Sequence, residues 1–153
     1  MEDMHVVVDA ADGQRLAAHF CKDTDEIGVQ SMRFGLQDKW FSVLGGIEDH
    51  VHILHSLGRT HSVAWVMEKL KSNSSRWMKE QGAAQFWWQP GYAAFSVGRS
   101  ELERAKRYIH RQREHHRQHS FEQELRALCA REPADASALE AFLTQEPRRG
   151  GTR

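Results

Sequence analysis

Two histidines one residue apart lie within a short apolar stretch of the chain. His50 and His52 flank a valine within residues 47–55, a segment whose pattern predicts a buried strand. Side chains at positions i and i+2 of a strand point to the same face, so both imidazoles can reach one divalent cation. By itself the pair is a weak signal, because many such pairs are ordinary surface or core residues.

A second set of reactive side chains falls at helical spacing further along the chain. Tyr108, Gln112 and either His115 or His116 are spaced so that they share one face of a helix. The phenol of Tyr108 is a candidate nucleophile, but its usual pKa of about 10 means that it needs local activation. Gln112 offers a hard carbonyl oxygen that suits Mg²⁺ or Mn²⁺ beside a histidine. The competing interpretation is a tyrosine at the edge of the core, on a helix whose basic face is solvated.

Basic side chains gather in two helical stretches, although the formal net charge of the whole chain is zero. Lysines, arginines and small hydroxyls of this kind contact phosphates in nucleic-acid complexes, but they are equally common on any solvated helix. The candidates are Lys69, Lys71, Ser75, Arg76, Arg104, Arg107 and Arg111. The three arginines also lie within one turn of Tyr108, where positive charge favours the phenolate. Trp87, Trp88 and Tyr92 either stack on unpaired bases or pack in the core.

Length and composition indicate one ordinary globular domain. The chain has 153 residues, 40% of them hydrophobic and 27% charged. No apolar run approaches the roughly 20 residues of a membrane helix, and the first residues carry no secretory signal pattern. Two cysteines far apart fit no metal site, so we expect reduced thiols and a cytoplasmic protein. The chain has no glycine-rich phosphate loop, cysteine cluster or G-x-S-x-G motif.

Hydrophobic periodicity predicts the elements that must position these residues. Strands are expected at 4–8, 40–44, 47–55 and 92–97, with a weak helix at 14–21. A helix should begin after Ser62 and end near Gly82. A long helix should run from a capping box at Ser100 and Glu103 to about residue 116, and a short one should follow a second box at Ser120 and Gln123.

This order of elements predicts an α+β fold of the ferredoxin-like kind. An antiparallel sheet would carry its helices on one face, with the long C-terminal helix presenting Tyr108. We expect a single domain over residues 1–132 and a loosely ordered tail over residues 133–153.

Four ordered blocks of this sequence resemble one protein family. GGIEDHVHIL, LKSNSSRW, WWQPGYAAFSV and YIHRQREHH, the last followed by SFEQEL, resemble the single-tyrosine HUH transposases of the insertion sequence 200/605 type, which include the REP-associated tyrosine transposases. The likeness spans about residues 45–128. Residues 1–44 diverge from the family, since acids replace an expected basic patch.

The resemblance implies a fold, a reaction and a set of residues. It implies that His50, His52 and Gln112 hold Mg²⁺ or Mn²⁺ and that Tyr108 attacks a phosphate of single-stranded DNA. It also implies that the protein recognises DNA hairpins. The tyrosine would become joined to the 5′ phosphate and leave a free 3′ hydroxyl that later rejoins strands. Some members are homodimers and others act as monomers; we expect a homodimer here.

Three alternatives remain open from the sequence. The divergent N-terminus is compatible with a degenerate or domesticated relative that binds hairpin or single-stranded DNA without cutting it. An RNA-binding ferredoxin-like module would use Trp87, Trp88 and the helix of Lys69 and Lys71, but would leave the histidine pair and Tyr108 unexplained. A rolling-circle replication initiator uses the same residue types in a chain that is normally longer.

Overall fold

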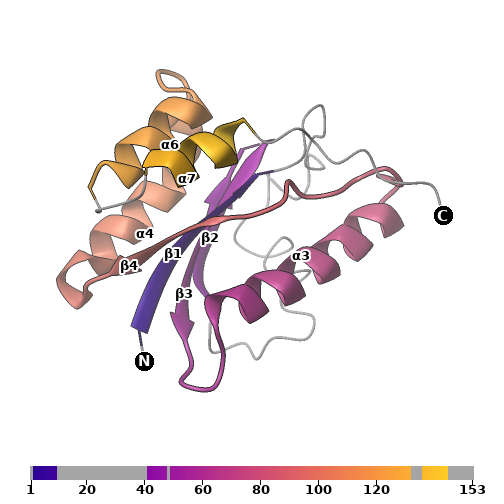
Figure 1. The fold of residues 1–153 in the computed structure, drawn as a ribbon, viewed down its shortest axis with the longest axis horizontal. Coiled ribbons are helices and arrows are strands. Elements are labelled where there is room, and N and C mark those ends of the chain that lie inside the picture. The colour runs from indigo at the N-terminus through magenta and orange to yellow at the C-terminus, as the bar shows by residue number, and fades with distance from the viewer. Residues whose placement is uncertain (1, 10–40, 48, 132–135, 145–153) are drawn as a thin grey trace.

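The computed structural model describes residues 2–9, 41–47, 49–131 and 136–144, and Figure 1 shows their arrangement. Four strands form one sheet: β1 (Glu2–Asp9), β2 (Phe41–Gly46), β3 (His50–Leu57) and β4 (Ala93–Val97). Their order is β2-β3-β1-β4, and every neighbouring pair is antiparallel. The α+β, ferredoxin-like expectation is therefore confirmed.

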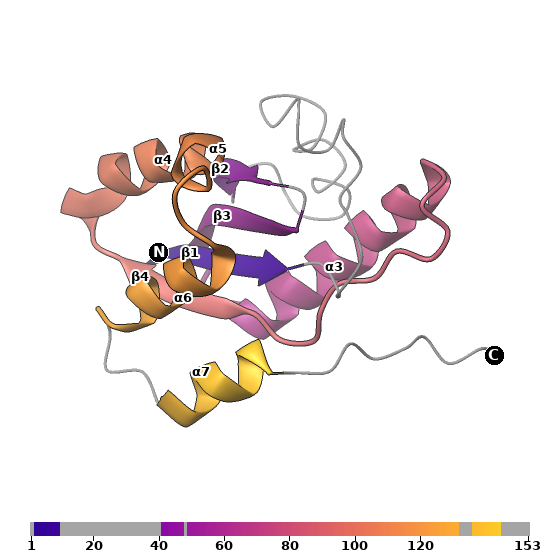
Figure 2. The same cartoon turned by 90° about the horizontal axis from the view of Figure 1, so that it is seen from above.

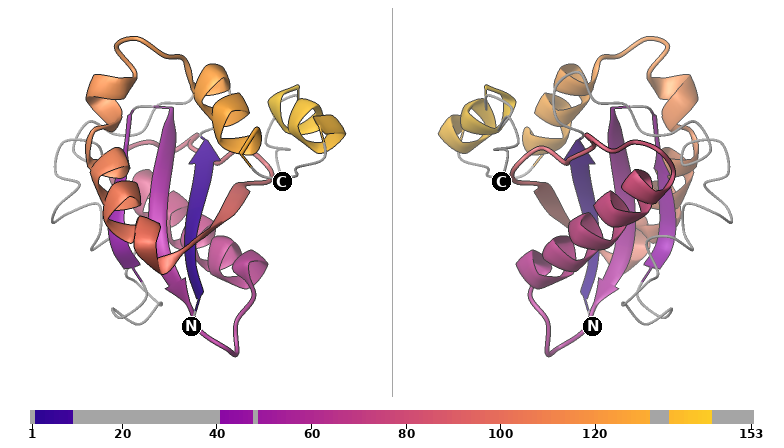
Figure 3. Two further views of the ribbon diagram at one scale, coloured as in Figure 1. Left: turned by 90° about the vertical axis from the view of Figure 1, so that its left-hand side faces the viewer. Right: turned by 90° about the vertical axis from the view of Figure 1, so that its right-hand side faces the viewer.

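Helices cover both faces of this sheet, so the expectation of helices on one face was wrong. Helix α3 (Val63–Glu80) packs on one face, while α4 (Leu102–His110), α5 (Gln112–His115) and α6 (Phe121–Cys129) lie on the other (Figure 3). The reason lies in β3, which is buried on both of its faces from His50 to His55. A sheet with two buried faces needs a layer on each.

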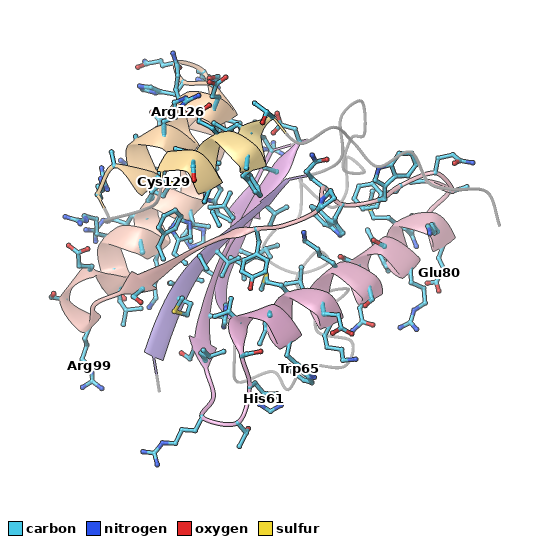
Figure 4. The ribbon with its side chains drawn as sticks, viewed as in Figure 1. His61, Trp65, Glu80, Arg99, Arg126 and Cys129 are labelled. Atoms are coloured by element: carbon cyan, nitrogen blue, oxygen red, sulfur yellow. The ribbon has the colours of Figure 1, made fainter. Side chains whose placement is uncertain are left out.

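The face under α3 holds the apolar core. Val6, Val51 and Ile53 from the central strands meet Met67 and Leu70 of α3. The expected N-cap is confirmed, because the Ser62 side chain accepts a hydrogen bond from the backbone N–H of Trp65. In Figure 4, Trp65 and Glu80 mark the two ends of this helix. No helix among the described residues is long and apolar enough to cross a membrane.

The aromatic loop after α3 contributes to the same core. Phe86 and Trp88 are buried there, and the Trp88 indole N–H donates to Ser74 Oγ at 2.8 Å. Trp88 is thus a packing residue, which removes it from the surface that an RNA-binding module would need.

The long helix expected through residue 116 is divided in two. Its backbone leaves the helical region at Arg111, whose N–H is shared between the carbonyls of Arg107 and Tyr108. The start of the helix also differs from the capping box expected at Ser100 and Glu103. A short 3-10 turn (Arg99–Glu101) precedes α4, and no side chain caps α4. The second capping box is confirmed, since Ser120 and Gln123 bond to each other's backbone N–H groups.

The C-terminal region also differs from the loosely ordered tail expected after residue 132. Helix α7 (Ala136–Leu143) forms on the outer side of α6 (Figure 2). Arg126 of α6 pairs with Glu140 of α7 through two contacts. The weak helix expected at 14–21 lies outside the described residues.

Candidate active site

The histidine pair occupies the face of β3 opposite the apolar core. His50 and His52 point to this face because they alternate with the core residues Val51 and Ile53, as the strand periodicity predicts. Both imidazoles are fully buried. Their rings lie 5.0 Å apart between centroids, close enough to share one ligand.

A buried carboxylate from α6 meets both histidines. Glu124 Oε2 lies 3.2 Å from His52 Nε2 and 3.3 Å from His50 Nε2. The Nε2 atom of His116, at the end of α5, lies 3.0 Å from the same oxygen. One ligand atom from each of these four residues falls within 4.8 Å of the other three, so the cluster could hold a metal ion.

Tyr108 and Gln112 reach the other oxygen of that carboxylate. The Tyr108 hydroxyl donates to Glu124 Oε1, and Gln112 Nε2 donates to it at 2.9 Å. The tyrosine ring also stands 5.8 Å from the ring of His52, between centroids. Tyr108, His50, His52 and Gln112, all predicted from the sequence, therefore converge within one chain around Glu124. A separation of more than about 10 Å between Tyr108 and both histidines would instead have favoured the RNA-binding alternative.

The donor set fits a divalent cation. Imidazole nitrogens and a carboxylate oxygen are ordinary ligands for such ions. Gln112 Oε1 is buried and accepts no hydrogen bond from any of the described residues. A buried carbonyl oxygen without a donor is costly, and a cation would satisfy it.

Sequence reasoning missed Glu124. The signal was present in α6, where Glu124 shares the helical stripe of Phe121, Leu125 and Leu128 and is only 3% exposed. A carboxylate within an apolar stripe must find polar partners once it is buried. The sequence predicts His116 only as a neighbour of Tyr108 along the helix, whereas the structure also places its ring 4.5 Å from that of His50, between centroids.

A further histidine, His5, supports the pair from β1. His5 is buried, and its Nε2 lies 2.9 Å from Nδ1 of His52. Because His52 turns its Nε2 toward Glu124, the contact from His5 on the other ring nitrogen holds the His52 ring in this orientation. His5 is thus a positioning residue for His52.

Burial and the central carboxylate set the ionisation of the cluster. Desolvation lowers the pKa of His52 to about 4 and that of His5 to about 3, so both are neutral near pH 7. Desolvation acts the same way on His50, but hydrogen bonds to Asp49 and Glu124 outweigh it and raise its pKa to about 9. Burial opposes ionisation of Glu124, yet its hydrogen bonds to the histidines and Tyr108 hold its pKa well below the usual range.

The phenol of Tyr108 is not activated by the arginines as expected. Burial, followed by the hydrogen bond to Glu124, raises its pKa well above the usual value. Arg104 forms an ion pair with Glu101 on the helix surface. Arg107 and Arg111 are exposed and line a hollow beside Tyr108. Burial and the adjacent carboxylate therefore outweigh Gln112 and Arg131, which lower the pKa of the phenol.

The predicted DNA-binding residues separate into two groups. Arg104, Arg107 and Arg111 lie on the same side of the sheet as the histidine pair. Lys69, Lys71, Ser75 and Arg76 are carried by α3 on the opposite side (Figure 3). Lys71 Nζ donates to the carbonyls of Gln89 and Gly91, so this lysine anchors the aromatic loop.

Comparison with known proteins shows the family of the chain. Residues 31–112, more than half of the chain, match the family model described as "Transposase IS200 like". Among solved structures, a "putative transposase" from Deinococcus radiodurans R1 is 18% identical, with a TM-score of 0.46 over 72% of this chain and 89% of that one. No curated protein matches the sequence significantly. The chain belongs to the IS200-like transposase family.

Proposed function

We propose that this protein cuts and rejoins single-stranded DNA through Tyr108, with the help of a divalent cation. The observation that carries the proposal is the shared carboxylate. Glu124 hydrogen-bonds to the Tyr108 hydroxyl with one oxygen and contacts His50 and His52 with the other. A candidate nucleophile and a candidate metal site are therefore adjacent, as phosphoryl transfer requires.

The residues that would hold the cation are His50, His52 and Glu124, joined by His116 or by Gln112 Oε1. The ion would supply Lewis-acid polarisation of the scissile phosphate. Of the two ions expected, Mn²⁺ suits this donor set better than Mg²⁺, because Mg²⁺ prefers oxygen ligands and water.

The chain's own residues account for the positioning of the nucleophile. Tyr108 Oη would attack phosphorus and form a P–O bond, while the 3′ oxygen leaves and takes up a proton. The proton that Tyr108 must lose already points at Glu124 Oε1. Attack by the free 3′ hydroxyl would later break the phosphotyrosine bond, so rejoining needs no external energy source.

We expect the DNA backbone to approach along α4 and α5. Arg107 and Arg111 are exposed there, beside Tyr108 and His115. Their positive charge would make binding salt-dependent. Because Tyr108 and the histidines of one chain meet, each protomer carries the whole proposed set. The homodimer, the recognition of hairpins and the cytoplasmic location stay predictions.

A covalent-adduct assay tests the proposal. The protein is incubated with Mn²⁺ and single-stranded DNA that contains subterminal hairpins, and adducts are resolved by denaturing electrophoresis. We expect an adduct with wild type and none with Tyr108→Phe, which removes only the hydroxyl. Absence of adduct from the wild type, or an undiminished yield from the variant, contradicts the proposal.

A DNA-binding protein that does not cut is the second candidate. The raised pKa of Tyr108 favours it, since this phenol stays protonated near neutral pH. Hairpin binding that persists in EDTA, with no cleavage in any divalent metal, would distinguish it from the transposase.

A further inference from the structure

Two hollows of different character meet at Tyr108. The larger has a volume of about 640 Å³ and lies between β4, α4 and α6. The smaller, of about 420 Å³, follows α4 and α5. Both are lined by Tyr108, so a strand attacked by this residue has room on either side of the attacked phosphate.

The walls of the two hollows are formed by different kinds of side chain. Apolar side chains form part of the wall of the larger cavity: Phe95, Val97, Ala105, Ala127 and Leu128. The smaller hollow is lined by polar and charged side chains, among them Arg107, Arg111, Gln118 and His119. The basic side chains of the smaller hollow suit a sugar-phosphate backbone, and the apolar part of the larger cavity suits a flat, weakly solvated group.

We propose that the larger cavity takes a single unstacked nucleobase, from the nucleotide next to the phosphate that Tyr108 attacks. This inference rests on the proposed function and extends it to base recognition. The cavity volume is within the range of about 300–1,000 Å³ that holds small organic ligands. Phe95 supplies an aromatic surface in the wall, and base–aromatic stacking is a general means of holding an unpaired base.

Charge at the cavity supports the same occupant. Arg104 and Arg131 both line it, together with Glu101, which pairs with Arg104. A nucleotide would present its base to the apolar wall and its phosphate to these guanidinium groups. Glu124 lies at the Tyr108 side, so the base would enter beside the candidate metal site. Base identity would then be read on one side of the cleaved bond and only the backbone on the other.

Selection from a random library tests this reading. Single-stranded DNA of random sequence is incubated with the protein and Mn²⁺, and covalently captured strands are sequenced together with their released partners. We expect a base preference of about tenfold at one of the two nucleotides flanking the cut, the size of one good base contact. Equal use of all four bases at both positions, in captured strands, overturns the cavity proposal while the proposed function stands.

Two matched variants on α6 sharpen the test. Ala127 and Ala130 are both exposed, but only Ala127 lines the cavity. Ala127→Trp should fill the cavity and abolish the preference, whereas Ala130→Trp should leave it unchanged. Retention of the preference in Ala127→Trp contradicts the proposal.

A measurement without cleavage keeps the cavity testable if no adduct forms. Binding of the four deoxynucleoside 5′-monophosphates is followed by saturation-transfer NMR in EDTA. We expect signals with wild type and with Ala130→Trp, and their loss with Ala127→Trp. Absence of signal from the wild type overturns the cavity proposal, whereas missing adducts alone count against the proposed function.

Discussion

Replacement of Glu124 by glutamine should change the stability of the metal-free protein in a pH-dependent way. The substitution keeps the shape of the side chain and removes its charge. Glu124 contacts His50, His52 and His116, and its hydrogen bond to His50 is one of the causes that raise the pKa of His50 to about 9. The substitution should therefore lower the free energy of unfolding most at the pH values where His50 is charged.

The magnitude follows from the shift at His50. Its pKa is 6.5 in the unfolded reference and about 9 in the folded protein. A shift of this size corresponds to about 3 kcal/mol of stability. Because the folded pKa is raised, this stability is fully present below pH 6.5 and is lost as the pH rises through 9. Asp49 remains in the variant, so we expect Glu124→Gln to retain roughly half of this pH-dependent contribution.

The other histidines act in a different pH range. The pKa values of His5 and His52 are lowered to about 3 and about 4, so they weaken the fold as the pH falls below 6.5. Between pH 6.5 and pH 9, His50 is therefore the one of these three histidines that makes stability depend on pH.

Urea denaturation in EDTA at pH 6.5 and pH 9 measures the effect. Glu122→Gln is the matched control, because Glu122 is an exposed residue of the same helix and forms a surface ion pair with Arg126. We expect the control to follow the wild type within about 0.5 kcal/mol. An equal pH dependence in wild type and Glu124→Gln would refute the assigned role of the carboxylate.

Substitutions at four further positions test other parts of the structure. His5→Phe should weaken Mn²⁺ binding by about 10–100-fold in calorimetry, because the contact to His52 is lost. His5→Gln keeps an acceptor and should recover part of the Mn²⁺ affinity. Equal Mn²⁺ affinity in the wild type and both variants would count against the positioning role of His5. Replacement of either Arg107 or Arg111 by alanine should reduce the slope of log K against log salt by about 1, where K is the binding constant for single-stranded DNA. An unchanged slope would show that the replaced arginine does not contact the DNA. Gly45→Ala should destabilise the fold by about 1–3 kcal/mol in denaturant titration, because the added Cβ would lie 2.4 Å from the carbonyl oxygen of Ile109; a neutral effect would mean that α4 moves freely over β2.

Local periodicity accounts for the features that the sequence determined. Alternation along residues 47–55 assigned His50 and His52 to one face of a strand, and the structure confirms it. The caps at Ser62 and Ser120 were also readable, because each depends on residues no more than three positions away. The first three blocks of the resemblance fall within the family match over residues 31–112, which also includes Tyr108 and Gln112 of the fourth block.

Tertiary structure decided which of these residues meet and what else joins them. Glu124 is 72 positions from His52 in the chain, and only the return of α6 over the sheet brings the two together. Burial and the Glu124 carboxylate on α6 raise the pKa of Tyr108, although the arginines nearby in sequence predicted a lowered pKa. Side-chain spacing in sequence reports neighbours within one strand or helix, whereas contacts between elements depend on how both faces of the sheet are buried.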